Sequence, residues 1–156
     1  MRNERFDKVS RLLLEALQAD SRLSTQALAE KVGLSATPVW RRIKELEDSG
    51  VIRRHVALLD REKLGLHICV LANVTLQRHS DGATDQFEAM VNASPEIVEC
   101  HSITGQADYV LKVVVEDIKA YERFLQLKIF KVPGIGSVHS NVVLREVKYE
   151  TALPTT

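Results

Sequence analysis

Apolar residues recur at helical spacing near the start of the chain. The first such stretch follows the i, i+3, i+4 pattern of a helix that buries one stripe of side chains, at Val9, Leu12, Leu13, Ala16 and Leu17. Asp7 is a predicted N-cap for this helix, and Ser24 is a predicted N-cap for a second, shorter one. These positions predict two helices within the first 33 residues.

A tight turn is predicted directly after the second helix. Gly33 supplies the left-handed backbone conformation that such a turn needs, and the small Ala29 lets two helices cross closely. Ser35 is a predicted N-cap for a third helix, and Pro38 falls in its first turn, where it removes no hydrogen bond. The core stripe of this third helix is Val39, Ile43 and Leu46. Helix, tight turn and helix predict a helix-turn-helix unit.

The third helix turns short polar groups and cations away from its core stripe, which is typical of a recognition helix. The stretch GVIRRHVALLD after it alternates in part and predicts a hairpin, the wing. The candidate DNA-contacting residues are Ser35, Thr37, Pro38, Arg41, Arg42, Lys44, Arg53 and Arg54. The alternative is a solvated basic face on a small helical bundle, and a lone Trp40 more often packs than touches DNA.

The second part of the chain repeats one pattern. P-x-I-x-x-x-H-S occurs at Pro95–Ser102 and again at Pro133–Ser140, 38 residues on, where a helix ends and a strand begins. The expected strands are His67–Gln77, Ile97–Thr104, Tyr109–Glu116 and Val138–Tyr149, and the expected helices are Thr84–Ala93 and Asp117–Ile129. This β-α-β, β-α-β order predicts a ferredoxin-like domain, so the whole chain belongs to the α+β class.

Two helices cover only one face of such a sheet. The third expected strand is nevertheless apolar on both faces, since Val110 and Val114 alternate with Tyr109, Leu111 and Val113. An uncovered apolar face predicts packing against a second subunit, and a two-fold dimer would present two recognition helices.

Composition excludes several classes of protein. Lys and Arg total 21 and Asp and Glu total 21, so net charge indicates no partner. A basic cluster is nevertheless formed by Arg41, Arg42, Lys44, Arg53 and Arg54. We expect a cytoplasmic protein with reduced thiols at Cys69 and Cys100, because there is no secretory signal, no long apolar run and no CxxC spacing.

No metal, cofactor or catalytic site is expected. The two His-Ser pairs fall on opposite edges of the expected sheet, about 14 Å apart at about 4.8 Å per strand, too far for one ion. The sequence holds no GxSxG, Walker loop, HExxH or full GxGxxG motif, so nothing in it demands an enzyme.

The chain resembles the Lrp/AsnC (feast/famine) family of transcriptional regulators over nearly its whole length. The resemblance rests on LSTQALAEKVGLSATPVWRRIKELEDSGVIRRHVALLD, on Leu64-Gly65, on GQADYVLKVVVEDIKAYERF, on VPGI and on VVLREVKYETALP. It implies a winged helix-turn-helix DNA-binding domain over 1–60, a linker over 61–66 and an effector-sensing ferredoxin-like domain over 67–156. It also implies double-stranded DNA and an amino acid as partners, and dimers that often assemble into octamers.

The resemblance also implies an effector site at the loop between the second and third strands. The family wording is close to G-[DE]-[YF]-D-Y, and here Gln106 and Ala107 depart from it. The implied effector-binding residues are Gly105, Gln106, Ala107, Asp108, Tyr109 and, in the last strand, Ser140. The alternative is that Gly105–Asp108 serves only as a hairpin turn.

Two other classes of function remain open from the sequence. Some haem-pathway decarboxylases share this architecture, although the intact basic recognition helix argues against an enzyme. An architectural DNA-wrapping protein with little effector response is the other alternative.

Overall fold

The computed structural model describes residues 6–77 and 82–155. Contacts divide the chain into two compact units, Leu59–Val147 and a unit that combines Met1–Leu58 with Lys148–Thr156. The expected second domain ran to Thr156, whereas the described residues of the C-terminal segment have their contacts with the first unit.

Three helices form the first unit, as predicted: α1 (Lys8–Ala19), α2 (Thr25–Val32) and α3 (Ala36–Asp48). The caps explain where they begin and end. The Asp7 and Ser24 side chains accept hydrogen bonds from backbone N–H groups in the first turns of α1 and α2, and Gly33 ends α2 with φ of 70°. Side chains from all three helices meet in a small core of Leu13, Leu28, Ala29 and Val39, two of them from α2. Helix α3 is therefore fixed by its buried stripe and turns its other faces outward.

The hairpin expected after α3 is not formed in the described part of the chain. Residues 51–59 are extended, almost wholly exposed and assigned to no strand. A strand needs a partner for its backbone N–H and C=O groups. Among the described residues, the one backbone bond made by this stretch joins the Ile52 N–H to the Leu46 carbonyl of α3. The partial alternation of apolar and polar residues predicted a hairpin here, but the described chain offers no second strand for this stretch to pair with.

The second unit has the predicted β-α-β, β-α-β order. Its elements are β1 (Ile68–Leu76), α4 (Ala83–Asn92), β2 (Ile97–Ser102), β3 (Tyr109–Val115), α5 (Ile118–Leu127), the 3₁₀ turn η1 (Ile129–Lys131) and β4 (Ile135–Val142). They build one antiparallel sheet in the order β2-β3-β1-β4. The ferredoxin-like prediction is confirmed. Strand β4 stops at Val142, short of the expected Tyr149, because its partner β1 begins at Ile68 and its last bond there joins the Val143 N–H to the Cys69 carbonyl.

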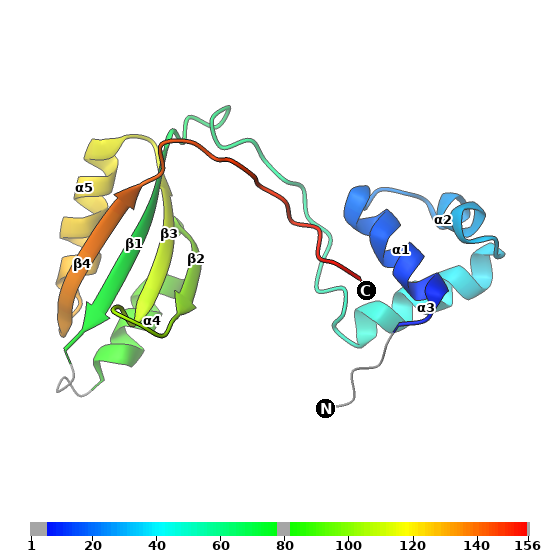
Figure 1. Cartoon of the computed structure of the whole chain (residues 1–156), viewed down its shortest axis with the longest axis horizontal. Helices are drawn as coiled ribbons and strands as arrows, with labels where there is room; N and C mark the ends of the chain where they lie inside the picture. The colour runs from blue at the N-terminus through cyan, green and yellow to red at the C-terminus, as the bar shows by residue number, and fades with distance from the viewer. Residues whose placement is uncertain (1–5, 78–81, 156) are drawn as a thin grey trace. The chain divides into compact units, whose positions relative to one another are not determined.

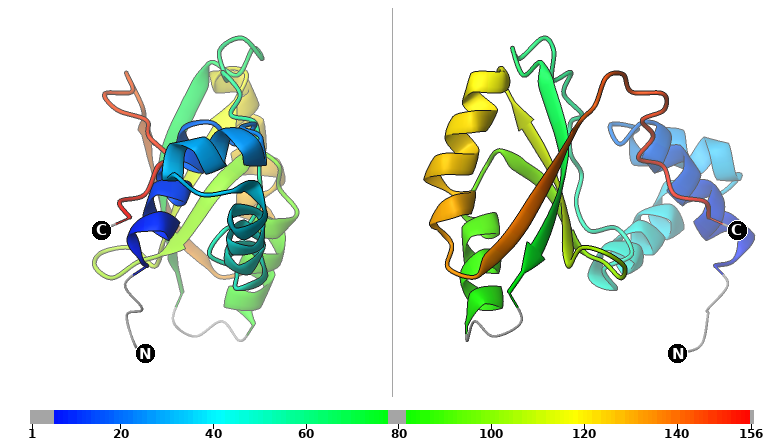
Figure 2. Two further views of the ribbon diagram at one scale, coloured as in Figure 1. Left: turned by 90° about the vertical axis from the view of Figure 1, so that its right-hand side faces the viewer. Right: turned by 60° about the vertical axis from the view of Figure 1, so that its left-hand side comes forward.

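Helices α4 and α5 cover the same face of the sheet (Figures 1 and 2). The core between them and the sheet contains Val70, Val74, Phe87, Leu111, Val113, Phe124 and Ile129, each no more than 4% exposed. No helix among the described residues covers the other face, which we call the open face. Its apolar residues include Cys69, Leu71, Val110 and Val114, which alternate along their strands with the core residues, and of these Cys69 and Val114 are already buried.

The open face is more polar than the sequence alone predicted. Lys112 donates a hydrogen bond to Glu99 (Nζ to Oε1, 3.1 Å), and His101 Nε2 lies 3.5 Å from the other oxygen of Glu99. The registers also place His101 and His139 in one row, on the two edge strands, joined through Val110 and Asn73. The repeated octapeptide therefore marks the two edges of the sheet, as predicted.

Candidate DNA-binding surface and effector loop

The exposed face of α3 carries the predicted recognition residues. Thr37 and Pro38 lie exposed at its N-terminal end, and Ser35 is its N-cap residue, although its side chain makes no cap hydrogen bond. The Ser35 hydroxyl is therefore not committed to the first turn of the helix, unlike the side chains that cap α1 and α2. Short groups at the N-terminal end of a helix suit contact with base edges in a DNA groove.

Two cations follow on the same helix. Arg41 lies 3.5 Å from Glu45 and Lys44 lies 3.8 Å from Asp48, both at i, i+4 spacing, and all four side chains are more than half exposed. Exposed ion pairs of this kind contribute about 0–1 kcal/mol. Both cations can therefore leave these carboxylates for a phosphate group at little cost.

Arg42 makes its hydrogen bonds within the helical unit and not on the exposed face of α3. Its guanidinium donates hydrogen bonds to the Asp7 carboxylate and to Ser10 Oγ (Nη1 to Oγ, 2.9 Å). Asp7 caps α1 by accepting from the Ser10 N–H, and this bond together with the Arg42 bond lowers the pKa of Asp7 from 3.8 to about 2. Arg42 thus joins α3 to the N-terminal end of α1 and points away from the recognition face.

Arg53 and Arg54 are exposed on the extended segment after α3. The next residue, His55, lies with Nε2 3.1 Å from Glu47 Oε1 near the end of α3. This contact ties the start of the extended segment to the recognition helix, so the two arginines follow directly from its C-terminal end.

The predicted effector loop joins β2 to β3. Gly105 has φ of +123°, a conformation that side-chain-bearing residues rarely adopt, which explains the glycine at this position. Asp108 is bonded to β1 twice: its carboxylate accepts from the Leu76 N–H (2.8 Å), and its own N–H donates to the Val74 carbonyl (3.0 Å). Thr75 Oγ1 also donates weakly to the Gln106 carbonyl (3.4 Å). The loop is therefore a well-tethered turn with one carboxylate lone pair occupied out of about four.

Tyr109 and Ser140 point toward the helices. The Tyr109 ring packs 4.7 Å from that of Phe87, and its hydroxyl donates to Glu88 of α4 (3.0 Å). Burial, together with that bond to Glu88, raises the pKa of Tyr109. Ser140 shares a 2.7 Å hydrogen bond with the Tyr121 hydroxyl of α5.

One chain does not bring Ser140 to the loop. Ser140 pairs with Ala72, three residues along β1 from the row of Asp108, and the whole of β1 separates β4 from β3. About 10 Å along the strand and about 10 Å across it give a separation of about 14 Å. Within one chain, Ser140 and the loop therefore do not line a common site.

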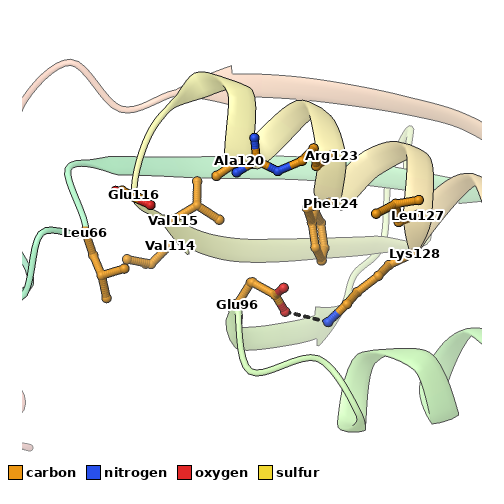
Figure 3. Close-up of a pocket in the computed structure, with 10 residues that line it drawn as sticks. All are labelled: Leu66, Glu96, Val114, Val115, Glu116, Ala120, Arg123, Phe124, Leu127 and Lys128. Atoms are coloured by element: carbon orange, nitrogen blue, oxygen red, sulfur yellow. Dashed lines mark hydrogen bonds and ion pairs between the residues drawn. The ribbon is translucent and has the colours of Figure 1, made fainter.

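A shallow cavity of about 320 Å³ lies elsewhere in this unit, between α5, β3 and the start of β2 (Figure 3). Glu96 and Lys128 meet across it in a 2.8 Å ion pair. Burial alone would raise the pKa of Glu96, but the bond from Lys128 holds that pKa below its usual value. None of the predicted effector residues lines this cavity.

Two further observations concern residues 6–77 and 82–155. Among these residues, no group of three or more His, Cys, Asp or Glu side chains is placed to hold a metal ion. No helix among them has the length and apolar character needed to cross a bilayer.

Several residues with a structural role carry no signal in the sequence. Ser10, Glu88 and Tyr121 each hold one predicted site residue in place. A hydroxyl or carboxylate on a helix carries no pattern that names a partner far along the chain. The position of Arg42 near the boundary of the core stripe of α3 is the one feature in the sequence that sets it apart from Arg41 and Lys44.

A helix-turn-helix unit with an exposed cationic recognition helix, joined to a ferredoxin-like unit, defines a two-domain DNA-binding regulator. Residues 6–53 match the family described as winged helix-turn-helix DNA-binding, and residues 69–153 match the Lrp/AsnC ligand binding domain. The chain belongs to the Lrp/AsnC family of transcriptional regulators.

Individual relatives support this family assignment. The chain is 41% identical to the DNA-binding transcriptional activator DecR of Escherichia coli over 96% of this chain and 98% of that one. It is 37% identical to the leucine-responsive regulatory protein of Salmonella typhimurium over 95% and 90%. A solved transcriptional regulator from Neisseria meningitidis, in complex with L-Met, superposes with a TM-score of 0.91 at 35% identity, covering 96% of each chain. These relatives are named as regulators, and this chain is a DNA-binding regulator and not an enzyme.

Proposed function

We propose that the chain is a sequence-specific transcriptional regulator whose DNA binding or assembly responds to an amino acid. The observation that carries the DNA-binding part is the exposed face of α3, with Thr37 and Pro38 at its N-terminal end and Arg41 and Lys44 behind them. The proposed DNA contacts are these four with Ser35, Arg53 and Arg54. Arg42, which is bonded to Asp7 and Ser10, has a structural role in this proposal.

The proposed effector is an apolar amino acid. One relative is named leucine-responsive, and another was solved with L-Met. We place its charged ends at the Gly105–Asp108 loop, where Asp108 keeps free lone pairs for an ammonium group and the glycine leaves backbone amides open. Ala107 stands where the family has an aromatic residue, which leaves additional room for an apolar side chain.

The proposed active form is a dimer, with further assembly into an octamer. Support comes from the open face, where Leu71 is 40% exposed and the partly exposed Val110 lies on the neighbouring strand. Such an apolar area on one side of a sheet favours a second copy as its cover. A dimer would also allow the loop of one copy to approach Ser140 of another.

A thermal-shift screen against the twenty amino acids tests the effector proposal. A ligand that binds only the folded protein raises stability by RT ln(1 + [L]/Kd), about 2.7 kcal/mol at 100 times Kd. We expect a rise in Tm with one or more apolar amino acids. No shift with any of the twenty at millimolar concentration, from a protein that still binds DNA, would favour the architectural DNA-wrapping alternative.

A further inference from the structure

The C-terminal segment is bound to the first helix of the DNA-binding unit. The Gln18 side-chain amide makes two hydrogen bonds to the backbone of Leu153: Oε1 accepts from the Leu153 N–H (2.6 Å), and Nε2 donates to its carbonyl (3.1 Å). One turn earlier, Glu15 accepts from the Thr155 hydroxyl (2.8 Å). Residues about 135 positions apart in sequence are thereby joined on one face of α1, and the red end of the chain lies beside this helix (Figures 1 and 2).

The C-terminal segment contributes mainly backbone groups to its contact with α1. The Leu153 side chain is 75% exposed, so it contributes little apolar burial. Paired donor and acceptor bonds from one amide to one residue imitate the pairing of two strands and fix the direction of the segment. The same surface of α1 borders a groove of about 1120 Å³ between the extended residues 51–58 and the C-terminal segment. The segment thus forms one wall of the DNA-binding unit.

Helix α1 is held at its other end by the recognition helix. Asp7 and Ser10, in its first turn, accept hydrogen bonds from Arg42 of α3. Helix α1 therefore lies between two sets of polar contacts, with the C-terminal segment at its last two turns and α3 at its first turn.

We propose that the C-terminal segment, residues 148–155, is a strap that transmits the position of β4 to the recognition helix through α1. The covalent path is short, because β4 ends at Val142 and the segment joins the DNA-binding unit from Lys148. The linker after Leu59 is the other covalent connection between the units. A shift of β4 on effector binding or assembly would pull on the strap. This would change how firmly α1 holds α3.

Hydrogen exchange in the full-length protein tests the docking of the strap. Leu153→Pro removes the N–H that Gln18 accepts, while Leu153→Ala keeps it and changes only an exposed side chain. We expect the amides in the last two turns of α1 to exchange about 2- to 10-fold faster in Leu153→Pro, as loss of one or two ordinary hydrogen bonds predicts. Leu153→Ala should match wild type.

A second pair of variants removes the partner on α1. Gln18→Ala should accelerate exchange in α1 as Leu153→Pro does, whereas Gln26→Ala, an exposed glutamine of α2, should not. Wild-type exchange in α1 for both Gln18→Ala and Leu153→Pro would show that the docked strap adds nothing, and would overturn the proposal.

A double-mutant cycle on DNA affinity tests transmission to α3. Gln18→Ala should weaken binding to a fixed duplex in the wild-type background and have no further effect in an Arg42→Ala background, because the route is then already broken. Strictly additive effects, or no effect of Gln18→Ala on binding, would overturn the route through α1. If the wild-type protein binds no DNA, the proposed function itself fails, while the exchange experiment still decides whether the strap is docked.

Discussion

Arg42 of the recognition helix donates hydrogen bonds to Asp7, the residue that caps α1, and to Ser10 one turn further on. Its neighbour Arg41 has, among the described residues, only the exposed Glu45 as an ion-pair partner. Two adjacent arginines thus have different roles, one in holding helices together and one on the proposed DNA-binding face. In the sequence, only the position of Arg42 near the boundary of the core stripe of α3 distinguishes the two.

Acid titration should reveal the Arg42–Asp7 contact. The folded pKa of Asp7, about 2, lies below its ordinary 3.8, so its stabilising contribution is complete above pH 4 and is lost as pH falls toward 2. Asp7→Asn keeps a good helix cap but removes the charge. The Tm of wild type should exceed that of Asp7→Asn at pH 5, and the gap should close near pH 2. A gap that is constant with pH would contradict this assignment.

Alanine at Arg41 and alanine at Arg42 should affect different properties. Arg42→Ala should lower Tm, because it removes hydrogen bonds to Asp7 and Ser10, while Arg41→Ala should leave Tm close to that of wild type, since exposed pairs contribute little. Differential scanning calorimetry of both variants makes the comparison. Equal losses of Tm would show that Arg41 also has a structural role.

Arg41→Ala and Lys44→Ala should each weaken DNA binding without unfolding the protein. If each side chain contacts one phosphate, affinity should fall similarly on all duplex sequences, and the slope of log K against log salt should fall by about one. Fluorescence anisotropy at several salt concentrations measures both. Unchanged affinity in both variants would show that the basic cluster is only a solvated face and does not contact DNA.

Asp108→Asn should reduce the response to the effector. Asparagine still offers an oxygen to the Leu76 N–H, so the loop should keep its shape, while the loss of charge removes a contact to an ammonium group that is worth about 1.5–3 kcal/mol. Effector affinity should fall about 10- to 100-fold by calorimetry, with effector-free DNA binding nearly unchanged.

The matched variant is Asp108→Ala, which also removes the bond to Leu76. If Asn binds the effector as wild type does and only Ala fails, Asp108 is a turn residue and not a ligand contact. Lost DNA binding in a folded Asn variant would show that the loop sets assembly.

A glutamate on the open face should disrupt self-association. Val110 lies on this face between Asn73 and His101, so Val110→Glu would bury a carboxylate in the proposed interface. Ile118→Glu, at an exposed position in the first turn of α5, is the control. Light scattering at micromolar concentration should show at least a dimer for wild type and the control, and a smaller species for Val110→Glu. A monomeric wild type would exclude the sheet-to-sheet dimer.

Local patterns were enough for most of the fold. Caps at Asp7 and Ser24, the left-handed Gly33 and apolar spacing predicted helices within a few residues, and the repeated octapeptide predicted that β2 and β4 are the sheet edges. These features depend on neighbours in sequence, which is why the sequence carries them.

Features that depend on distant partners were not predictable in the same way. The extended residues after α3 alternate enough for a strand but have no pairing strand in the described chain, and β4 ends where β1 no longer accompanies it. Likewise, Gln18 carries no pattern that indicates Leu153, and Tyr109 could be assigned to the core only when Phe87 and Glu88 were seen beside it.

Selection of duplexes from a random-sequence library, followed by anisotropy titration of the enriched sequence with and without L-Met or L-Leu, tests the central claim most directly. A sequence-specific, amino-acid-responsive regulator should bind the enriched duplex at least about 10³-fold more tightly than a scrambled one at physiological salt. Its affinity or stoichiometry should also change when the amino acid is present. Equal affinity for all duplexes and no response to either amino acid would contradict the account.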